Sequence, residues 1–527
     1  MPADPAPRPC PGEGMTQSAA DSAASAVPAS TAVRWLAFIA ACLGSAAYVV
    51  ALTTSGTALP YMQGAFSAAP DQMSWMLTSF IIGTTIVTAC TGWISTRFGR
   101  KRIHLISLAG FTIASLLCGL SSSLYEAVIY RVLQGMFGAP LLPMGQAIGT
   151  DLFPPEKQGF VIGALAVGAA SGAVVGPYAG GVLVELYGWP WVFFIIVPLG
   201  SVAFLASWLF TRVAPSDRSQ TMSWPGFTLL SIAICAFQLA LNRGERLEWF
   251  ESPEIIAEVA VACLAFYAFI AHTMLGRRPF FDRALFLDRN YAIGNVLVFI
   301  YGALNFLQLF LVPVLLQSLA GYTIAEAGYL LGWRAAGLVL VSLAFSFVAD
   351  KVGARTAFIF GFLCMFVSAW SMSQWTTDVR GVDVAWTLFL QGACSAIAYI
   401  PIAVMAFATL PQRLKDEGTA VFYLMSTLGT ATGTALIYNV LSRSSKVNQD
   451  ALGAQLSNYS AAFRQGIVPS FLDPGIPGGL ATVSAEIARQ SAMIAYNNCF
   501  YLIAIVTLAT IPFALIVKLP KKGEASR

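Results

Sequence analysis

Two arginines lie inside long apolar stretches, where a charge is costly. Arg131 and Arg334 each interrupt a run of apolar residues long enough to cross a bilayer. On insertion scales, a charge at the centre of such a helix costs about 2.5 to 3.5 kcal/mol, so residues of this kind commonly line a polar cavity. A guanidinium cannot release a proton near neutral pH, so it can hold a substrate's polar group or water, or favour ionisation of a nearby acid. The structural alternative is an arginine bonded to backbone carbonyls or reaching the membrane surface.

The neighbours of these arginines are polar or small. Arg131 shares a helical face with Gln134 and Gly135, at spacings of three and four residues. Arg334 lies about eight residues inside its apolar span. We expect both to face a cavity, although any single polar residue could equally form an interhelical hydrogen bond. The further polar candidates for this cavity are Tyr301, Asn305, Gln308 and Gln391.

The 26 acidic residues all map to loops, tails or helix ends, so we expect no carboxylate at mid-depth. A proton-driven carrier usually relies on a buried carboxylate whose pKa is raised by its surroundings. If proton binding drives a conformational change in this protein, the proton would have to bind to a carboxylate near a helix end. Glu126 is close to Arg131 in sequence, Asp151 lies near a basic loop, and Glu326 is a third candidate.

The elements that must hold these residues are membrane-spanning helices. The chain is 527 residues long, 57% apolar and 11% charged, with a mean hydropathy of +0.70. Such a composition excludes a water-soluble domain of this size. About 20 apolar residues cross a bilayer, and fourteen such windows occur between residues 34 and 517. We therefore predict an all-α multi-pass membrane protein with fourteen transmembrane helices.

The basic residues indicate the orientation. With both termini in the cytoplasm, 21 Lys and Arg residues lie inside and seven lie outside, as the positive-inside rule predicts. The net charge of +4 then reflects topology and gives no sign of nucleic-acid binding. Residues 1–33 are rich in Pro, Ala and Ser and are expected to form a disordered cytoplasmic tail. Residues 519–527 are expected to form a second cytoplasmic tail.

An internal repeat divides the helices into two halves. Residues 92–101 recur 254 positions later, and residues 133–135 recur 257 positions later. Parallel repeats of this kind form transporters with a substrate site at mid-membrane between the halves. We predict six-helix bundles at 34–213 and 277–518, joined by two inserted helices at 214–276.

Each copy of the repeat carries a tight basic turn. A charge-assisted contact from this turn to Asp151 would latch one end of the molecule in one state, so we assign both turns a gating role. The residues concerned are Gly92, Arg97, Gly99, Arg100 and Lys101 in the first copy and Asp350, Lys351, Gly353 and Arg355 in the second.

A stripe of small residues marks the apolar span 160–184. Its glycines recur every fourth position, which leaves a groove for the backbone of another helix. We expect this stripe to bring the two bundles together, and simple helix packing is the alternative. The stripe consists of Gly168, Gly172, Gly176, Pro177, Gly180 and Gly181.

Together these segments resemble the fourteen-helix drug:proton antiporter group of the major facilitator superfamily, the EmrB and QacA type. Residues 92–101 are similar to the superfamily's loop motif, 131–135 to its helix-4 motif, 172–181 to the exporter helix-5 motif, and 189–200 to a motif of the group. The resemblance implies proton-driven export of amphipathic compounds by alternating access, in a bacterial inner membrane. The expected partners are a small-molecule substrate, protons and the lipid bilayer.

The chain departs from the group's pattern at four positions. Ala51 and Gly56 replace the acid and the Asn of the helix-1 motif, Thr96 replaces the loop-motif Asp, and Pro190 replaces an Arg. The missing helix-1 acid and the buried Arg334 favour anionic or neutral amphipathic substrates over lipophilic cations.

The longest outer loop is expected at residues 442–490. In the EmrB type, the equivalent loop faces the periplasm, where a membrane fusion protein can dock and lead to an outer-membrane channel. The alternative is a mobile cap over the outer vestibule. Two other functions stay open, a proton-coupled importer of a small organic anion and a non-transporting membrane sensor or scaffold. We expect no enzymatic activity, cofactor or metal.

Overall fold

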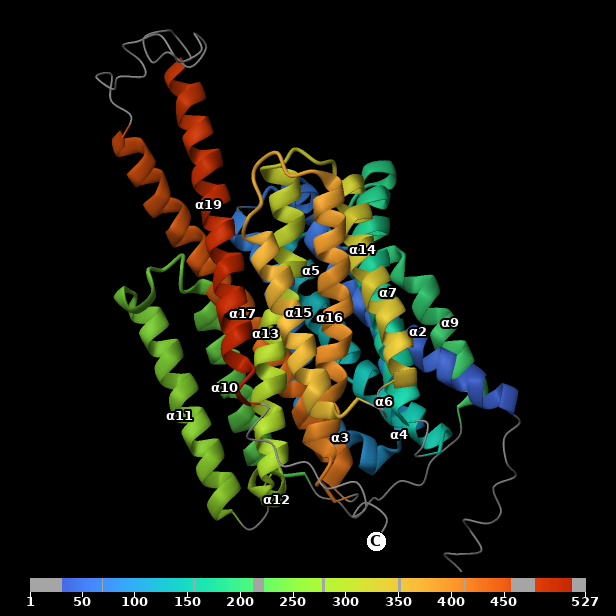
Figure 1. Cartoon of the computed structure of the whole chain (residues 1–527). Coiled ribbons are helices and arrows are strands. Elements are labelled where there is room, and N and C mark those ends of the chain that lie inside the picture. The colour runs from blue at the N-terminus through green and yellow to red at the C-terminus, as the bar shows by residue number, and fades with distance from the viewer. Residues whose placement is uncertain are drawn as a thin grey trace, which may run out of the picture.

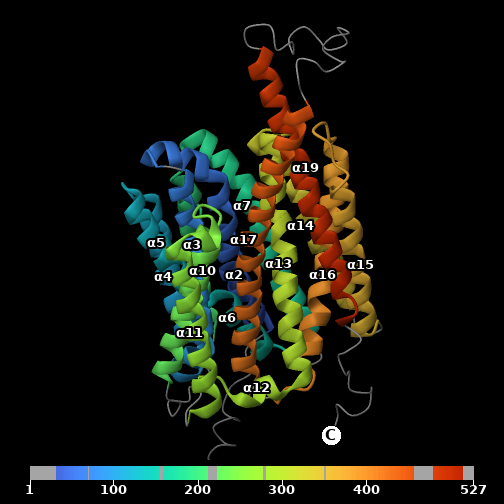
Figure 2. The ribbon, with the colours of Figure 1, turned by 90° about the vertical axis from the view of Figure 1, so that its left-hand side faces the viewer.

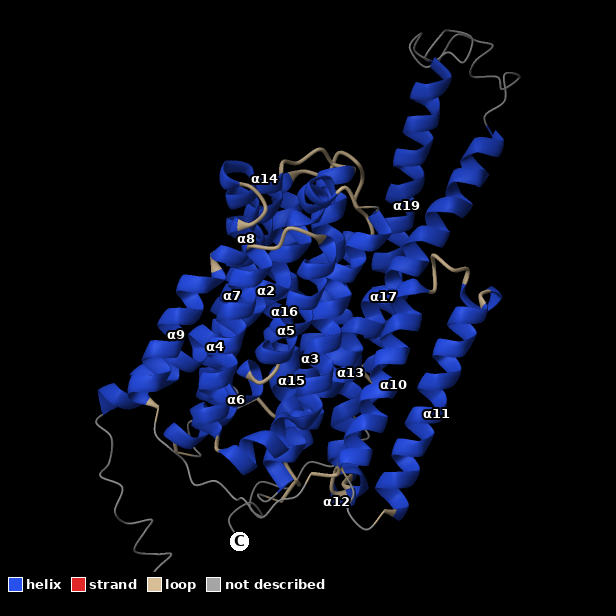
Figure 3. Cartoon of the chain, turned by 180° about the vertical axis from the view of Figure 1, so that it is seen from behind, coloured by secondary structure: helices blue, strands red, loops and turns tan. Residues whose placement is uncertain are grey.

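A computed structural model describes residues 31–68, 70–154, 158–211, 222–276, 280–348, 352–411, 414–455 and 479–513. Within these ranges the chain is helical and contains no strand (Figure 3). Thirteen of the described helices are long and apolar enough to cross a membrane. The tails expected at 1–33 and 519–527 lie outside the described residues, except for 31–33, which begin the first helix.

The fourteenth span is a broken helix. The helix expected near residues 125–149 is divided into α5 (Leu124–Gly138) and α6 (Leu141–Leu152). Pro140 lies in the break and Pro143 in the first turn of α6. Because proline has no N–H and its ring clashes with the preceding turn, it interrupts a helix.

Apart from the inserted pair described below, the spans fall into two sets of six, with α5 and α6 counted as one span. The first set comprises α2 (Thr31–Phe66), α3 (Pro70–Phe98), α4 (Arg100–Gly119), α5 with α6, α7 (Gln158–Tyr187), and α8 (Trp191–Phe194) with α9 (Ile196–Phe210). The second set comprises α13 (Arg289–Ser318), α14 (Ile324–Val348), α15 (Ala354–Met372), α16 (Gly381–Phe407), α17 (Lys415–Gln455) and α19 (Gly479–Thr510).

The two sets form bundles that lie side by side (Figure 2). In each bundle the first span packs against the fifth, the second against the fourth and the third against the sixth. The bundles meet where α7 packs against α14 and α3 packs against α17. We call the end near α12 (Arg283–Leu287) the lower end, and the end from which α17 and α19 project the upper end (Figure 1).

The inserted pair lies against both bundles. It consists of α10 (Trp224–Arg243) and α11 (Pro253–Leu275), separated by a short turn of 3-10 helix at Trp249–Glu251. α10 packs against α3 of the first bundle and α17 of the second, whereas α11 packs mainly on α10. At their upper ends, Arg243 donates a hydrogen bond of 2.7 Å to Glu258. The inserted pair thus has one helix packed against both bundles and one that packs mainly on its partner.

The outer segment expected as a loop at 442–490 is largely helical where it is described. α17 and α19 both continue beyond the bundle, and residues 456–478 between them lie outside the described residues. One polar contact bridges the two helices, since Asn498 of α19 donates to the Ser444 hydroxyl of α17 at 3.0 Å. Asn448, one turn further along α17, donates to the same hydroxyl at 3.3 Å. Sequence polarity marked the end of the membrane span, but it did not mark the end of the helix.

The glycine stripe of α7 packs within the first bundle. A Cβ atom added to Gly172 would lie 2.5 Å from the Ala46 carbonyl oxygen of α2, and one added to Gly176 would collide with the Thr53 hydroxyl. The other stripe residues, Gly168, Pro177, Gly180 and Gly181, are buried or half-buried in the same helix.

The expectation that this stripe brings the two bundles together is therefore corrected. The stripe fits α7 against α2, and a different face of α7 meets the second bundle. There, a Cβ atom on Gly328 of α14 would lie 3.0 Å from the Cα atom of Tyr178. Sequence spacing identified the close-packed face, but it could not identify the partner helix.

Candidate functional site

Arg131 is completely buried inside the first bundle. Its Nε donates to the Met76 carbonyl at 2.9 Å, and its two terminal nitrogens donate to Gln134 at 2.6 Å and to Ser55 at 3.0 Å. The guanidinium also lies over the ring of Phe80, with its central carbon 4.3 Å from the ring centre. Hydrogen bonds to a charged group contribute about 1.5 to 3 kcal/mol each, so this cluster holds α2, α3 and α5 together.

Two further contacts show how the cluster is closed. The Gln134 amide donates to the Ser115 hydroxyl of α4 at 2.7 Å. Arg131 also donates to the backbone carbonyl of Ala51 at 3.4 Å. Ala51 occupies the position at which the antiporter group that this sequence resembles carries an acid, so no carboxylate is present there. Neither Arg131 nor Gln134 borders any of the three cavities described below. The geometry therefore favours the structural reading for Arg131.

Arg334 forms a corresponding cluster in the second bundle. Its Nε donates to the Gln391 side-chain oxygen, and a terminal nitrogen donates to the Asn305 side-chain oxygen at 2.9 Å. Ser395 donates to the same Asn305 oxygen at 2.7 Å, and the Tyr301 hydroxyl donates to the Ser395 carbonyl at 3.2 Å. These contacts join α13, α14 and α16.

The two clusters are related by the sequence repeat but are not equivalent. Gln134 and Gln391 lie 257 positions apart, and each accepts from a buried arginine. The glycine that follows each glutamine packs on the backbone of a neighbouring helix, at Phe80 in the first bundle and at Arg334 in the second. Phe80 and Arg334 therefore hold matching positions, so the second bundle has a cation where the first has an aromatic ring.

A central cavity of about 220 Å³ lies between the bundles. Tyr301, Asn305 and Arg334 border it, whereas Gln391 lies behind Arg334 and Gln308 is buried in α13 without bordering it. Arg334 is the only charged side chain among the described residues that border this cavity. Its other walls are mainly aliphatic and aromatic, the combination that binds amphipathic small molecules.

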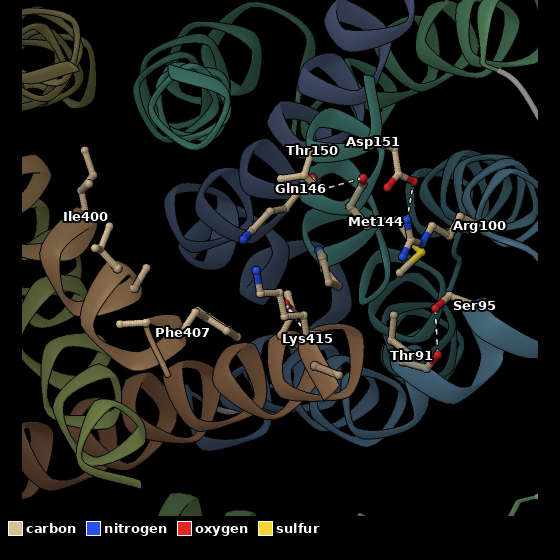
Figure 4. A pocket seen from close by; sticks show the side chains of 18 residues that line it. Thr91, Ser95, Arg100, Met144, Gln146, Thr150, Asp151, Ile400, Phe407 and Lys415 are labelled. Carbon is tan, nitrogen blue, oxygen red and sulfur yellow. Dashed lines mark hydrogen bonds and ion pairs between the residues drawn. The ribbon is translucent and has the colours of Figure 1, made fainter. Parts of the chain in front are cut away.

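A lower cavity of about 350 Å³ separates α3 and α6 from α16 and α17. Arg100 and Asp151 border it and form an ion pair, and in Figure 4 their side chains point toward one another. Ile400 and Phe407 line the opposite wall, from the second bundle (Figure 4). Asp151 thus contacts the basic turn where the two bundles face each other.

The geometry of the basic turn depends on Gly99. This residue has a φ of 89°, in the left-handed region that favours glycine. The turn places Arg100 beside Asp151, while Lys101 donates to the Trp208 carbonyl at 3.0 Å and Arg97 lies over the Trp93 ring at 5.6 Å. Gly92 also borders the lower cavity.

The second basic turn is described only in part. Asp350 and Lys351 lie outside the described residues. Gly353 precedes α15, and Arg355 lies in its first turn.

One hydrogen bond connects the two bundles where the central and lower cavities meet. The Tyr423 hydroxyl of α17 donates to the Gln146 side-chain oxygen of α6 at 2.7 Å. Gln146 borders both cavities, and Tyr423 borders the central one. Neither residue stands out in the sequence. Their signal was only a polar side chain in an otherwise apolar helix, which many residues of this chain share.

Glu126 and Glu326 both act as helix caps at the upper surface. The Glu126 carboxylate accepts from the Ser122 backbone N–H and hydroxyl, both at 2.9 Å. Glu326 does the same with Thr323, at 2.9 and 3.0 Å. Both contacts lie at exposed helix starts, and neither glutamate borders the described cavities. Of the three acids expected to carry the proton, only Asp151 borders one of the three cavities.

One half-buried carboxylate does not stand out in the sequence. Glu417 lies in the first turn of α17 and accepts from the backbone N–H of Asp282, at the start of α12. Its position at a helix end was clear from the sequence, but its burial depends on α12 folding over that end.

Comparisons with known proteins agree with this architecture. Residues 41–434 match the family model of the Major Facilitator Superfamily. The chain is 28% identical to the fatty acid resistance protein FarB of Neisseria gonorrhoeae over 496 residues, covering 92% of this chain and 96% of that one. It is also 28% identical to the multidrug export protein EmrB of Escherichia coli K12 over 491 residues, covering 92% and 95%.

A solved structure supports the fold independently. The crystal structure of the human organic anion transporter MFSD10 (TETRAN) aligns with a TM-score of 0.56, covering 91% of this chain and all of that one. At 13% identity, this likeness extends to the fold alone. Together with the family match and the arrangement of the helices, it shows that this multi-pass membrane protein is a transporter belonging to the Major Facilitator Superfamily.

Proposed function

We propose that the protein exports neutral or anionic amphipathic compounds from a bacterial cell in exchange for protons. The observation that carries this proposal is the central cavity between the bundles. Its walls are mainly apolar and aromatic, and Arg334 is the one charged side chain among the described residues that border it. The names of FarB and EmrB, a fatty acid resistance protein and a multidrug export protein, support export of such compounds.

The lower end is proposed to face the cytoplasm, with both termini on that side. The basic residues of the sequence support this orientation, because 21 of them fall in the loops and tails assigned to that side and seven on the other. A substrate would enter through the lower cavity, pass the Gln146–Tyr423 hydrogen bond and reach the central cavity. Rocking of the two bundles about this site would then expose it to the other side.

Asp151 is the acid that we propose for proton coupling. Its carboxylate faces the lower cavity and pairs with Arg100. Binding a proton would remove the carboxylate's charge and weaken that ion pair, which frees the basic turn to move with the lower end of the bundle. Losing the proton would restore the pair, so the proton and the conformation of the lower end would be linked.

The projecting ends of α17 and α19 are proposed as the contact site for a periplasmic membrane fusion protein leading to an outer-membrane channel. Two helices joined by the Asn498–Ser444 hydrogen bond offer a firmer surface than an open loop. The alternative, a cap over the upper end, predicts that shortening these helices would affect transport in purified vesicles that lack any partner.

Transport in inverted membrane vesicles tests the main proposal. Neutral, anionic and cationic probes with the same apolar tail should be compared under imposed pH and voltage gradients. We expect an acidic interior to drive uptake of the neutral and anionic probes, with little uptake of the cation. Vesicles from cells without the protein provide the control. Uptake only under the reversed gradient would support an importer, and the absence of uptake under any gradient would contradict transport of these compounds.

A further inference from the structure

An upper cavity of about 410 Å³ lies above the central one. Its walls come from α2 and α3 of the first bundle, α13 and α17 of the second, and the inserted helix α10. Leu52, Ile81 and Phe310 border both the upper and the central cavity. These three apolar side chains therefore lie between the two compartments.

The inserted helix contributes a buried amide to this cavity. Gln238 has no exposed surface, and neither its side-chain oxygen nor its side-chain nitrogen has a hydrogen-bond partner among the described residues. Leaving a buried donor and acceptor unpaired is costly, and such groups are usually satisfied by protein, water or a ligand. An unpaired amide in the wall of a cavity indicates that something else hydrogen-bonds to it.

The chemistry of the cavity restricts what that ligand can be. An amide side chain offers one acceptor and two donors, so its natural complement is a group that both donates and accepts, such as an amide, a hydroxyl or a protonated carboxyl. Glu245 also borders the cavity and pairs with Lys446 at 3.7 Å, and no Lys or Arg is among the described residues that border it, so an anion would find no cation there. Leucine, methionine and alanine side chains supply apolar walls for a hydrocarbon tail.

We infer that the upper cavity is a second binding site, in which Gln238 holds the neutral polar head of an amphipathic substrate after it leaves the central cavity. This inference rests on the proposed export function and adds a role for the inserted helices. The central site would select by the charge of Arg334, and the upper site would select by hydrogen bonding. A substrate would therefore pass from a site that holds it by a cation to one that holds it by an amide before release.

Photolabelling locates the second site without requiring transport. The probe is dodecanamide with a diazirine in its chain, bound to the full-length protein in lipid nanodiscs, and labelled peptides are identified by mass spectrometry. We expect label on α10 and on residues 431–439 of α17 as well as around the central cavity. Gln238→Leu should raise about tenfold the probe concentration at which the upper labelling is half-maximal, which corresponds to about 1.4 kcal/mol of binding free energy. The labelling around the central cavity should be unchanged.

A second buried glutamine provides the matched control. Gln308 also has a side-chain oxygen without a partner among the described residues, but it does not border the upper cavity. Gln308→Leu should therefore leave the upper labelling intact, and melting temperatures of both variants show whether they are folded. If Gln238→Leu fails to fold, Gln238→Met keeps a similar shape without the amide and should give the same loss.

The outcomes separate this inference from the function on which it rests. Label confined to the central cavity, or upper label that Gln238→Leu and Gln238→Met leave unchanged, would overturn the second site while leaving export in place. Equal loss of upper label in Gln308→Leu would also overturn it, since the effect would not depend on the cavity. Clear labelling of α10 in a protein that shows no uptake in vesicles would instead refute the export function.

Discussion

At the scale of single residues, two buried arginines with similar partners have different surroundings. The Arg131–Gln134 cluster joins four helices and borders none of the described cavities, whereas Arg334 borders the cavity between the bundles. The sequence showed that both lay in apolar spans and that Gln134 lay beside Arg131. It could not show that Gln391, 57 positions away, accepts from Arg334, because that pairing depends on how α14 and α16 pack.

Removing the charge of Arg334 should change substrate preference. We expect Arg334→Ala to weaken binding of an anionic amphipath by about 10- to 100-fold, since a hydrogen bond to a charged group contributes about 1.5 to 3 kcal/mol. Binding of a neutral probe of equal length should change little. Arg334→Lys should retain part of the anion binding, because the charge remains but the planar fork is lost. Isothermal titration of the purified variants measures both affinities.

Arg131 provides the contrasting variant in the same measurement. Because its guanidinium makes structural hydrogen bonds to Met76, Gln134 and Ser55, Arg131→Lys should lower the melting temperature and leave the ratio of anion to neutral affinity unchanged. A selective loss of anion binding in Arg131→Lys, or an equal loss of both ligands in Arg334→Ala, would contradict the division of roles between the two residues.

At the scale of the helices, hydropathy predicted the spans well because each one must be apolar along its length. It did not predict the break at Pro140 or the continuation of α17 to Gln455. A polar helix beyond the membrane has no hydropathy signal, and its stability here comes from contacts with α19. The stripe on α7 shows the same limit, since spacing predicted a close contact but left open whether α2 or α14 would fill it.

Two glycines of α7 allow a matched test of this packing. Gly172 faces the Ala46 carbonyl oxygen of α2, whereas a Cβ atom on Gly163 would meet nothing within 4 Å among the described residues. Replacing a helical glycine by alanine gains about 1 kcal/mol of helix propensity, so Gly163→Ala should be neutral or slightly stabilising. Gly172→Ala should cost about 1 to 3 kcal/mol through overpacking. Thermal unfolding in detergent ranks the two variants by stability. A Gly172→Ala protein as stable as the Gly163→Ala protein would contradict the close contact between α2 and α7.

At the scale of the whole molecule, three cavities follow one another between the bundles. The lower one contains the Arg100–Asp151 pair, the central one is bordered by Arg334, and the upper one by Gln238. The lower and central cavities meet at the Gln146–Tyr423 hydrogen bond, which joins opposite bundles. Such an arrangement suits alternating access, because motion of one bundle against the other changes which cavity connects to the central one.

The Gln146–Tyr423 bond should stabilise closure of the lower side of the central cavity. A neutral hydrogen bond contributes about 0.5 to 1.5 kcal/mol, so Tyr423→Phe should raise access from the lower side about two- to tenfold. Access is measured as the rate at which a membrane-impermeant thiol reagent modifies Thr427→Cys, with the parent protein as the background. Gln146→Leu should have the same effect, and the double variant should add little, since both changes remove one interaction. Fully additive effects would show that the two residues act separately.

Asp151 can be tested as the coupling residue by replacing it, with a Glu126 variant as the control. Asp151→Asn removes the group that would bind the proton but keeps a polar side chain beside Arg100. Substrate exchange at equal pH should therefore persist, whereas accumulation driven by a pH gradient should be lost, because the amide cannot take up and release a proton during the cycle. Glu126→Gln should keep both activities, since the glutamine can still cap the helix at Ser122. If Asp151→Asn still accumulates substrate in response to pH, the proton must bind elsewhere, and the half-buried Glu417 beside α12 becomes the next carboxylate to replace.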